Sequence, residues 1–265
     1  MKSRWRVLLC LAMVVAPGAG RAESARAPSS LCQIRHPGDA RVEWACQRVR
    51  RGETMQSLFG ERWVDVARFN RIDRRHVTAG MSLKVPTRLD EIAGFTPMPA
   101  EYPDALADAK FILVDLSEQF LGAYEHGRLV FSSPVAIGED GHETPAGDFR
   151  ITAAHRGHQS SLYRIENTEI PYPMNYALRF HVSREGVSYW IHGRDVTGYP
   201  VSHGCIGLYD EEMQREYYGY PSDPVLADAK VLYEWALGPG ADGGDVRILK
   251  DGPTMRIIGR APTSP

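Results

Sequence analysis

The 265-residue sequence is short of three things: cysteine, an excess of charge of one sign, and long apolar runs. Its 31 basic and 33 acidic residues are spread along the chain and leave a formal net charge of −2. Without a basic stripe, the sequence predicts no nucleic-acid partner. The apolar run from Val7 to Val15 is far shorter than the roughly 20 residues that cross a bilayer. Because 43% of the residues are apolar, the chain can still bury a core of ordinary size.

The first 22 residues have the three parts of a secretory signal peptide. Basic residues precede the run from Val7 to Val15, and small residues lead to Ala22, after which we expect cleavage. Cys10 follows Leu9 rather than a small residue, so it does not resemble a lipid-attachment cysteine and leaves with the signal. The sequence therefore predicts export to the periplasm or cell envelope, with no transmembrane anchor after cleavage.

The mature chain then keeps three cysteines, Cys32, Cys46 and Cys205. An odd number in an oxidising compartment indicates one thiol with a separate purpose. Cys32 and Cys46 are close enough in sequence to pair across a short loop, which would contribute about 3 kcal/mol to stability on the chain-entropy model. We therefore predict a Cys32–Cys46 disulfide and a free Cys205.

Residues 46–87 show the pattern of a strand, two helices and a strand. Thr54 is a typical N-cap for a helix that carries Leu58, and Val66 and Phe69 repeat the apolar spacing in a second helix. This segment resembles a LysM carbohydrate-binding module. The resemblance implies binding to the glycan strands of peptidoglycan, and the alternative is a small packing module that has lost its sugar groove.

Further along the chain, short β-branched or apolar runs between turn signals predict a mainly β domain. One helix is predicted from Pro224 to Leu237, with Asp223 as its cap. The expected strands are 111–116, 119–124, 129–134, 148–153, 176–182, 187–191, 246–250 and 254–258.

The stretch from residue 191 to 208 places one thiol close to two histidines. A cysteine attacks as the thiolate, and a free thiol with a pKa of about 8.5 is largely protonated at neutral pH, so it needs a base. Either His192 or His203 can supply that base. Gly204 lets the main chain approach closely, so that the N–H groups beside Cys205 can donate to an oxyanion.

Residue types alone leave two other interpretations of this stretch. Cys205 can be a buried packing residue, or it can join His192 and His203 as a zinc ligand. No second cysteine or carboxylate stands at a helpful spacing, and His203 and Cys205 are too close in sequence to share one ion well. We therefore predict neither a metal nor a cofactor.

The motif Ser-His-Gly-Cys at residues 202–205, with Ile-His-Gly upstream at 191–193, resembles the signature of the L,D-transpeptidase catalytic domain, also called YkuD. Residues 144–149, Thr-Pro-Ala-Gly-Asp-Phe, match the Thr-Pro-x-Gly-x-Phe segment of that family, and the 111–116 strand fits its first sheet. The resemblance covers about residues 110–250. It implies a β-sandwich-like catalytic domain behind the small α+β module.

By this resemblance, Cys205 attacks a peptidoglycan stem peptide between its third and fourth residues, expels D-alanine and holds the remainder as a thioester that an amine resolves. His192 takes the role of base and the Gly193 main chain orients its ring. His203 supports the turn together with Ser202 and Gly204. The residues by themselves do not decide between the two histidines.

Two departures from the family pattern concern the substrate site. The interval from His192 to Cys205 is shorter than in the family, and Gly207 stands where the family usually has arginine. Arg194 is the nearest guanidinium that can replace it and bind a stem-peptide carboxylate. Tyr172 and Met174 are expected to line the peptide groove.

The acceptor amine is open: a diaminopimelate residue would give a cross-link, and a lysine-ended wall protein would be anchored. A hydrolase that uses water and a non-catalytic peptidoglycan-binding protein are the alternative functions. The predicted organisation is a signal at 1–22, a spacer at 23–45, the LysM-like module at 46–87, a linker at 88–109, the catalytic domain at 110–250, and a strand and tail at 251–265.

Overall fold

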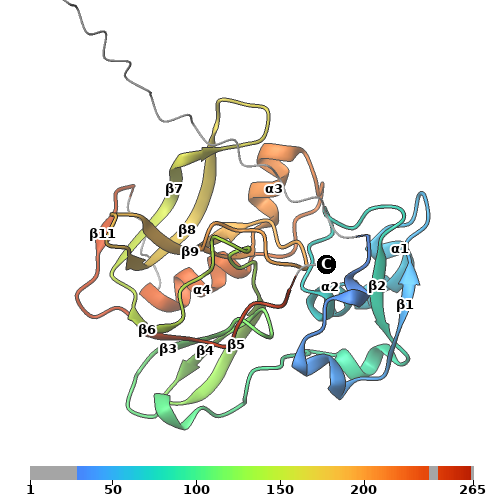
Figure 1. Ribbon diagram of the computed structural model, residues 1–265, viewed down its shortest axis with the longest axis horizontal. Helices are drawn as coiled ribbons and strands as arrows, with labels where there is room; N and C mark the ends of the chain where they lie inside the picture. Colours follow the sequence, from blue (N-terminus) through green and yellow to red (C-terminus); the bar gives the residue numbers. More distant parts are fainter. Residues whose placement is uncertain (1–28, 239–243, 264–265) are drawn as a thin grey trace, which may run out of the picture.

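The computed structural model describes residues 29–238 and 244–263, so the predicted signal peptide and Ala22 lie outside the described residues. A small module at the N-terminal end of the described chain, blue to cyan in Figure 1, lies beside a larger β-rich domain. The mainly β fold class is confirmed. No helix within the described ranges is long and apolar enough to cross a membrane.

The N-terminal module has the predicted order of strand, helix, helix and strand. β1 (Trp44–Arg48) pairs antiparallel with β2 (Ser82–Pro86), and α1 (Met55–Phe59) and α2 (Trp63–Asn70) lie between them in sequence. Thr54 and Ser57 close the start of α1, because each side-chain oxygen accepts a hydrogen bond from the other residue's main-chain N–H.

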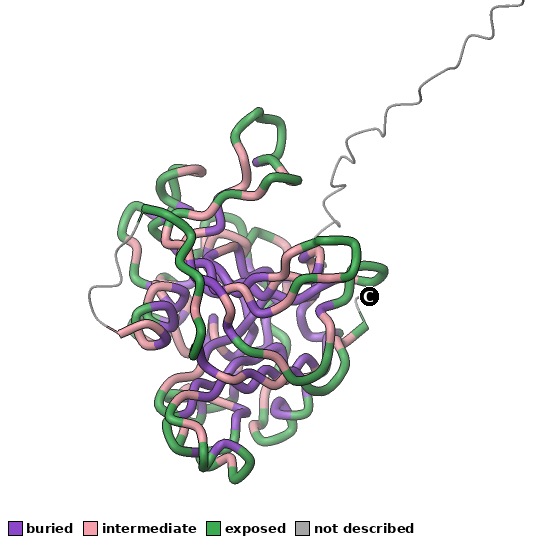
Figure 2. The backbone as a smooth tube through the Cα atoms, turned by 90° about the vertical axis from the view of Figure 1, so that its left-hand side faces the viewer, coloured by how far each residue is buried: buried purple, intermediate pink, exposed green. Residues whose placement is uncertain are grey.

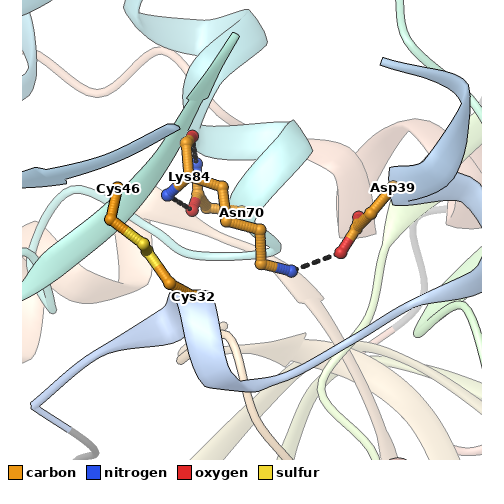
Figure 3. The surroundings of a disulfide bond; sticks show 5 residues. All are labelled: Cys32, Asp39, Cys46, Asn70 and Lys84. Atoms are coloured by element: carbon orange, nitrogen blue, oxygen red, sulfur yellow. Dashed lines mark hydrogen bonds and ion pairs between the residues drawn. A yellow bond between two sulfur atoms is a disulfide. The ribbon is translucent and has the colours of Figure 1, made fainter. Parts of the chain in front are cut away.

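The predicted spacer is folded from residue 31 onwards. Leu31 and Ile34 are both 1% exposed and belong to the core of the module, and two 3-10 turns at 31–33 and 37–41 bring them there. A disulfide joins Cys32 to Cys46 of β1, with their Cα atoms 6.1 Å apart (Figure 3). The few apolar side chains of this segment are enough to bury it, although the predicted organisation placed it in a spacer. We therefore define the N-terminal module as residues 31–87.

The larger domain contains two five-stranded sheets. One has the order β10-β9-β8-β7-β11 and the other β5-β4-β3-β12-β6. Figure 2 shows buried chain in the middle of the molecule and a mostly exposed loop, which joins β7 and β8, projecting from it. The strands are β3 (Phe111–Asp115), β4 (Phe120–Glu125), β5 (Arg128–Pro134), β6 (Gly147–Arg150), β7 (Ala153–Arg164), β8 (Pro171–Val182), β9 (Ser188–Arg194), β10 (Ile206–Tyr209), β11 (Arg247–Ile248) and β12 (Thr254–Ile258).

Two predicted boundaries of this domain differ from the structure. β12 lies inside a sheet, parallel to β3 and antiparallel to β6, because Met255 and Ile257 turn into the core. The predicted strand at 254–258 is therefore present, and it belongs to the larger domain. The predicted linker is also packed, since Met98 and Ala105 lie in an apolar cluster with residues of β3 and β4.

Two helices complete the domain. α4 (Asp228–Leu237) begins later than predicted, because the main-chain N–H groups of Val225 and Leu226 donate to the Glu211 carboxylate instead of entering a helix. Its apolar face then packs into the main core against β8, β9 and β10. α3 (Glu211–Tyr218), capped by Asp210, was not predicted.

Buried charges join the N-terminal module to the larger domain. Arg71, fully buried, lies 2.7 Å from Asp39 and 3.3 Å from Glu118 of the β3–β4 turn. Lys84 also reaches Asp39, at 2.5 Å (Figure 3). Beside them, burial and the positive charge of Arg71 lower the pKa of His36 to about 2, so this ring is neutral in the folded protein.

The neutral His36 predicts a loss of stability in mild acid. Its ordinary pKa is 6.5, so below that pH the unfolded chain binds a proton that the folded protein does not accept until about pH 2. We expect the wild type to lose about 2 kcal/mol more unfolding free energy between pH 7 and pH 5 than His36→Asn, which keeps a donor for Ser117. Urea unfolding at the two pH values measures this, and equal losses would contradict it.

Candidate active site

Cys205 lies immediately before β10, which runs parallel to β9 with Ile206 opposite Ile191. The side chain is half-buried and packs against the cluster that contains Trp190, Met174 and Tyr172. Burial raises the pKa of the Cys205 thiol, although the Trp190 main chain and Arg194 act in the opposite direction. The resting thiol is therefore protonated at neutral pH.

His192 occupies a buried position in β9. Its Nδ1 lies 2.8 Å from the carbonyl oxygen of Gly193, and because a carbonyl only accepts, Nδ1 carries the proton and Nε2 keeps its lone pair. Burial, followed by the charge of Arg194, lowers the pKa of His192 to about 3. A neutral imidazole whose Nε2 carries a lone pair can take a proton. Gly193 is required here because a Cβ would lie 2.4 Å from Asp210.

The turn before Cys205 is held by Ser202. Its Oγ donates to the carbonyl oxygen of Cys205 at 2.6 Å and accepts from the N–H of Gly204 at 3.2 Å. Gly204 has φ +99°, and a Cβ there would lie 2.4 Å from the Tyr189 ring. The Gly204 N–H is thus directed at Ser202, which fixes the turn.

His203 points to a different set of partners from His192. Its ring stacks on Tyr163 of β7, with centroids 4.4 Å apart and an angle of 22° between the planes. Its Nε2 lies 3.8 Å from Glu139, and burial, followed by the charge of His142, lowers its pKa. Tyr163 is near enough to Cys205 that the thiolate charge raises its pKa, after the larger effect of burial. Tyr163 was not among the predicted site residues, because no strand was predicted over residues 154–164.

The Arg194 side chain occupies the space above Gly207. A Cβ at Gly207 would lie 2.1 Å from Arg194 Cγ, so only one of the two positions can carry a long side chain. The Arg194 guanidinium carbon lies 5.7 Å from the centre of the Tyr172 ring. Arg194 Nε is buried and has no hydrogen-bond partner among the described residues. Its positive charge lowers the pKa of Cys205, His192 and His203.

These features can be compared with known proteins. Residues 109–248, more than half of the chain, match the model of the L,D-transpeptidase catalytic domain family, YkuD. The chain belongs to this family. It is an enzyme of the L,D-transpeptidase class, and this class acts on peptidoglycan.

Solved L,D-transpeptidases resemble the chain only distantly. An L,D-transpeptidase from Stackebrandtia nassauensis is 19% identical with a TM-score of 0.41, and the match covers 76% of this chain and 68% of that one. Residues 123-326 of one from Xylanimonas cellulosilytica DSM 15894 are 19% identical with a TM-score of 0.43, covering 80% and 98%. L,D-transpeptidase 3 from Mycobacterium tuberculosis, in complex with a faropenem-derived adduct, is 18% identical with a TM-score of 0.34, covering 57% and 60%.

A curated protein, the 3-hydroxybenzoate--CoA ligase of Aromatoleum sp. (strain CIB), is 37% identical over 65 residues. The matched segment covers 23% of this chain and 12% of the ligase's length.

Two groups in this L,D-transpeptidase have ligand atoms close enough to hold a metal ion. Glu139, His142 and His203 form one at the rim of the site, and Asp73, His76 and Asp195 form the other, with the ligand atoms of each group within 4.8 Å of one another. In the second group, the histidine and Arg75 already satisfy the two carboxylates.

The charge state of the pair predicts how Cys205 reacts with a small electrophile. Because the thiol pKa is raised and His192 is neutral, the thiolate fraction grows only as the pH rises past the ordinary thiol range. We expect the iodoacetamide alkylation rate of Cys205 to keep rising from pH 6 to pH 9, and His192→Asn to follow the same curve. Intact-mass measurements against time give the rates. A plateau below pH 7 would instead indicate a thiolate–imidazolium pair.

Proposed function

We propose that Cys205 is the nucleophile and His192 the base of an L,D-transpeptidase that acts on the tetrapeptide stem of peptidoglycan. The observation that carries the proposal is the neutral His192, whose Nδ1 donates to Gly193, in a family member with Cys205 immediately before the neighbouring strand β10. His192 Nε2 takes the thiol proton as Sγ attacks the carbonyl carbon between the third and fourth stem residues. The carbon–nitrogen bond to D-alanine breaks, and His192 returns the proton to the leaving amine.

A second acyl transfer completes the cycle. An acceptor amine attacks the thioester carbonyl, gives up a proton to His192 and releases the Cys205 thiol. The main-chain N–H of Cys205 is the proposed oxyanion donor, because the N–H of Gly204 is already directed at Ser202. The acceptor is a diaminopimelate amine for cross-linking, or a lysine of a wall protein for anchoring.

The substrate groove is proposed to lie along Tyr172 and Met174, which pack in the same cluster as Cys205. The guanidinium of Arg194 would hold a carboxylate of the stem peptide. The buried, unpartnered Nε supports this role, since a ligand oxygen would satisfy it. His203 and its stacking partner Tyr163 would limit where the acceptor enters.

We also propose that the chain is exported and works in the periplasm. The signal-peptide pattern at residues 1–22 supports export, and the class supports action at the cell envelope. The N-terminal module is proposed to bind glycan strands as a LysM-like unit, on the strength of its sequence pattern and its strand-helix-helix-strand order.

Product analysis tests the reaction. The mature protein from Glu23 onwards is incubated with disaccharide-tetrapeptide, alone and with a lysine-ended peptide, and products are identified by mass spectrometry. We expect loss of D-alanine with a cross-linked dimer or a peptide adduct, and no product from Cys205→Ala. Tripeptide alone would indicate a hydrolase. Full activity in Cys205→Ala would refute the mechanism.

Moving the guanidinium tests the role of Arg194. A charged hydrogen bond contributes about 1.5–3 kcal/mol, so Arg194→Ala should lower kcat/KM for the tetrapeptide about 10- to 100-fold. The double variant Arg194→Ala/Gly207→Arg should recover part of that loss, because the alanine frees the space that an arginine at 207 needs. Gly207→Arg alone is the matched control and should be poorly tolerated. Unchanged kcat/KM in Arg194→Ala would remove Arg194 from the site.

A further inference from the structure

The loop between His192 and Cys205 is bound to the N-terminal module. The N–H of Asp73, just after α2, donates to the carbonyl oxygen of Val196 at 2.6 Å, and the N–H of Val196 donates to the Asp73 carboxylate at 2.8 Å. Ile72 and Thr197 form a β-bridge beside them. Two residues of the loop are therefore paired through main-chain hydrogen bonds with a segment more than 100 positions earlier in the sequence.

The Asp73 carboxylate is fully buried and joins three parts of the protein. Besides Val196, it accepts from Nε2 of Gln214 in α3 at 2.8 Å and from Nδ1 of His76 at 2.7 Å. The same Gln214 amide donates to Asp195 at 2.9 Å. Arg75 completes the arrangement, 2.9 Å from the Asp195 carboxylate.

Apolar packing closes the same contact. Val196 and Tyr199 of the loop are buried in one core with Leu31 and the α2 side chains of the module. A Cβ at Gly198 would lie 2.9 Å from Leu31, so the loop and the module approach as closely as glycine permits. The module therefore packs directly against the loop between His192 and Cys205, the catalytic loop.

We propose that Asp73 is a positioning residue for the reaction, and that the N-terminal module holds the active site in shape whether or not it binds glycan. The inference rests on the proposed function of Arg194. Arg194 is the last residue of β9 and directly precedes Asp195, so the hydrogen bonds to residues 195 and 196 fix the strand end from which its side chain crosses Gly207. Loss of these hydrogen bonds would let the Arg194 guanidinium move away from the substrate carboxylate. His192 in β9 and Cys205 just before β10 would stay in place, because the two strands remain paired.

This proposal changes what removal of the module should do. A glycan-binding module on a flexible connection could be deleted without harm to chemistry on soluble fragments. Here the deletion would expose Val196 and Tyr209, and would leave the buried Glu211 without Arg74, which lies 2.8 Å away. A point change at Asp73 is therefore the sharper test.

The experiment is a double-mutant cycle on the full mature chain. Acylation of Cys205 by a carbapenem, which carries a carboxylate, is compared with alkylation by iodoacetamide, which carries none, for wild type, Asp73→Ala, Arg194→Ala and the double variant. We expect Asp73→Ala to slow acylation about 10- to 100-fold and to change alkylation far less. The double variant should be no slower than Arg194→Ala, because both changes remove the same contact. Asp90→Ala, an exposed acidic residue of the same module, should react as the wild type does.

Each result has a distinct meaning. Additive losses in the double variant, or equal losses in acylation and alkylation, would overturn the positioning role and leave the proposed function standing. A wild type that the carbapenem does not acylate would overturn the proposed function and this inference with it. Melting temperatures identify variants that do not fold, and Gln214→Ala, which removes the amide that donates to both Asp73 and Asp195, takes the place of an unfolded Asp73→Ala in the same cycle.

Discussion

The arrangement of the active site depends on one buried carboxylate. Asp73 receives hydrogen bonds from a main-chain N–H, an amide and an imidazole, and these partners belong to the catalytic loop, to α3 and to the module itself. A carboxylate without water is costly unless every lone pair is used, so the three parts are stable only in the arrangement that satisfies it. The buried charges around Arg71 must likewise be paired, and they join the module to Glu118 in the β3–β4 turn. Two sets of paired charges thus make two apparent domains one structural unit.

Local pattern in the sequence accounts for much of the fold. Alternating or continuous apolar runs predicted most strands, and the Thr54 cap predicted α1, because these features act within a few residues. The sequence did not show α3, whose residues 211–218 are mostly polar, because its place is set by the cap at Asp210 and by Arg74. It also did not show that residues 31–45 are folded. Arginines and aspartates in such segments usually face water, and only the tertiary fold shows which are buried.

The candidate site divides in the same way. The motif at 202–205 and His192 were visible because the proposed nucleophile, its turn and the proposed base lie within one short stretch of sequence. The sequence also identified Gly207 as a departure from the family pattern and Arg194 as the nearest arginine that could replace the missing one. Only the packing explains why the two residues occur together: the Arg194 side chain occupies the space that a side chain at position 207 would need. Tyr163 and Glu139 come from distant strands and loops, so no local pattern could have placed them at the rim beside His203.

The protonated state of Cys205 bears on how long such an enzyme survives. Peroxides and disulfides react with thiolates, and susceptibility follows thiolate character and exposure. A half-buried thiol with a raised pKa, next to an imidazole that carries no charge, offers little thiolate to these oxidants at rest. In the proposed reaction, the sulfur attacks the substrate carbonyl as the His192 lone pair takes the thiol proton. A protonated thiol between turnovers would let an unpaired cysteine persist in an oxidising compartment.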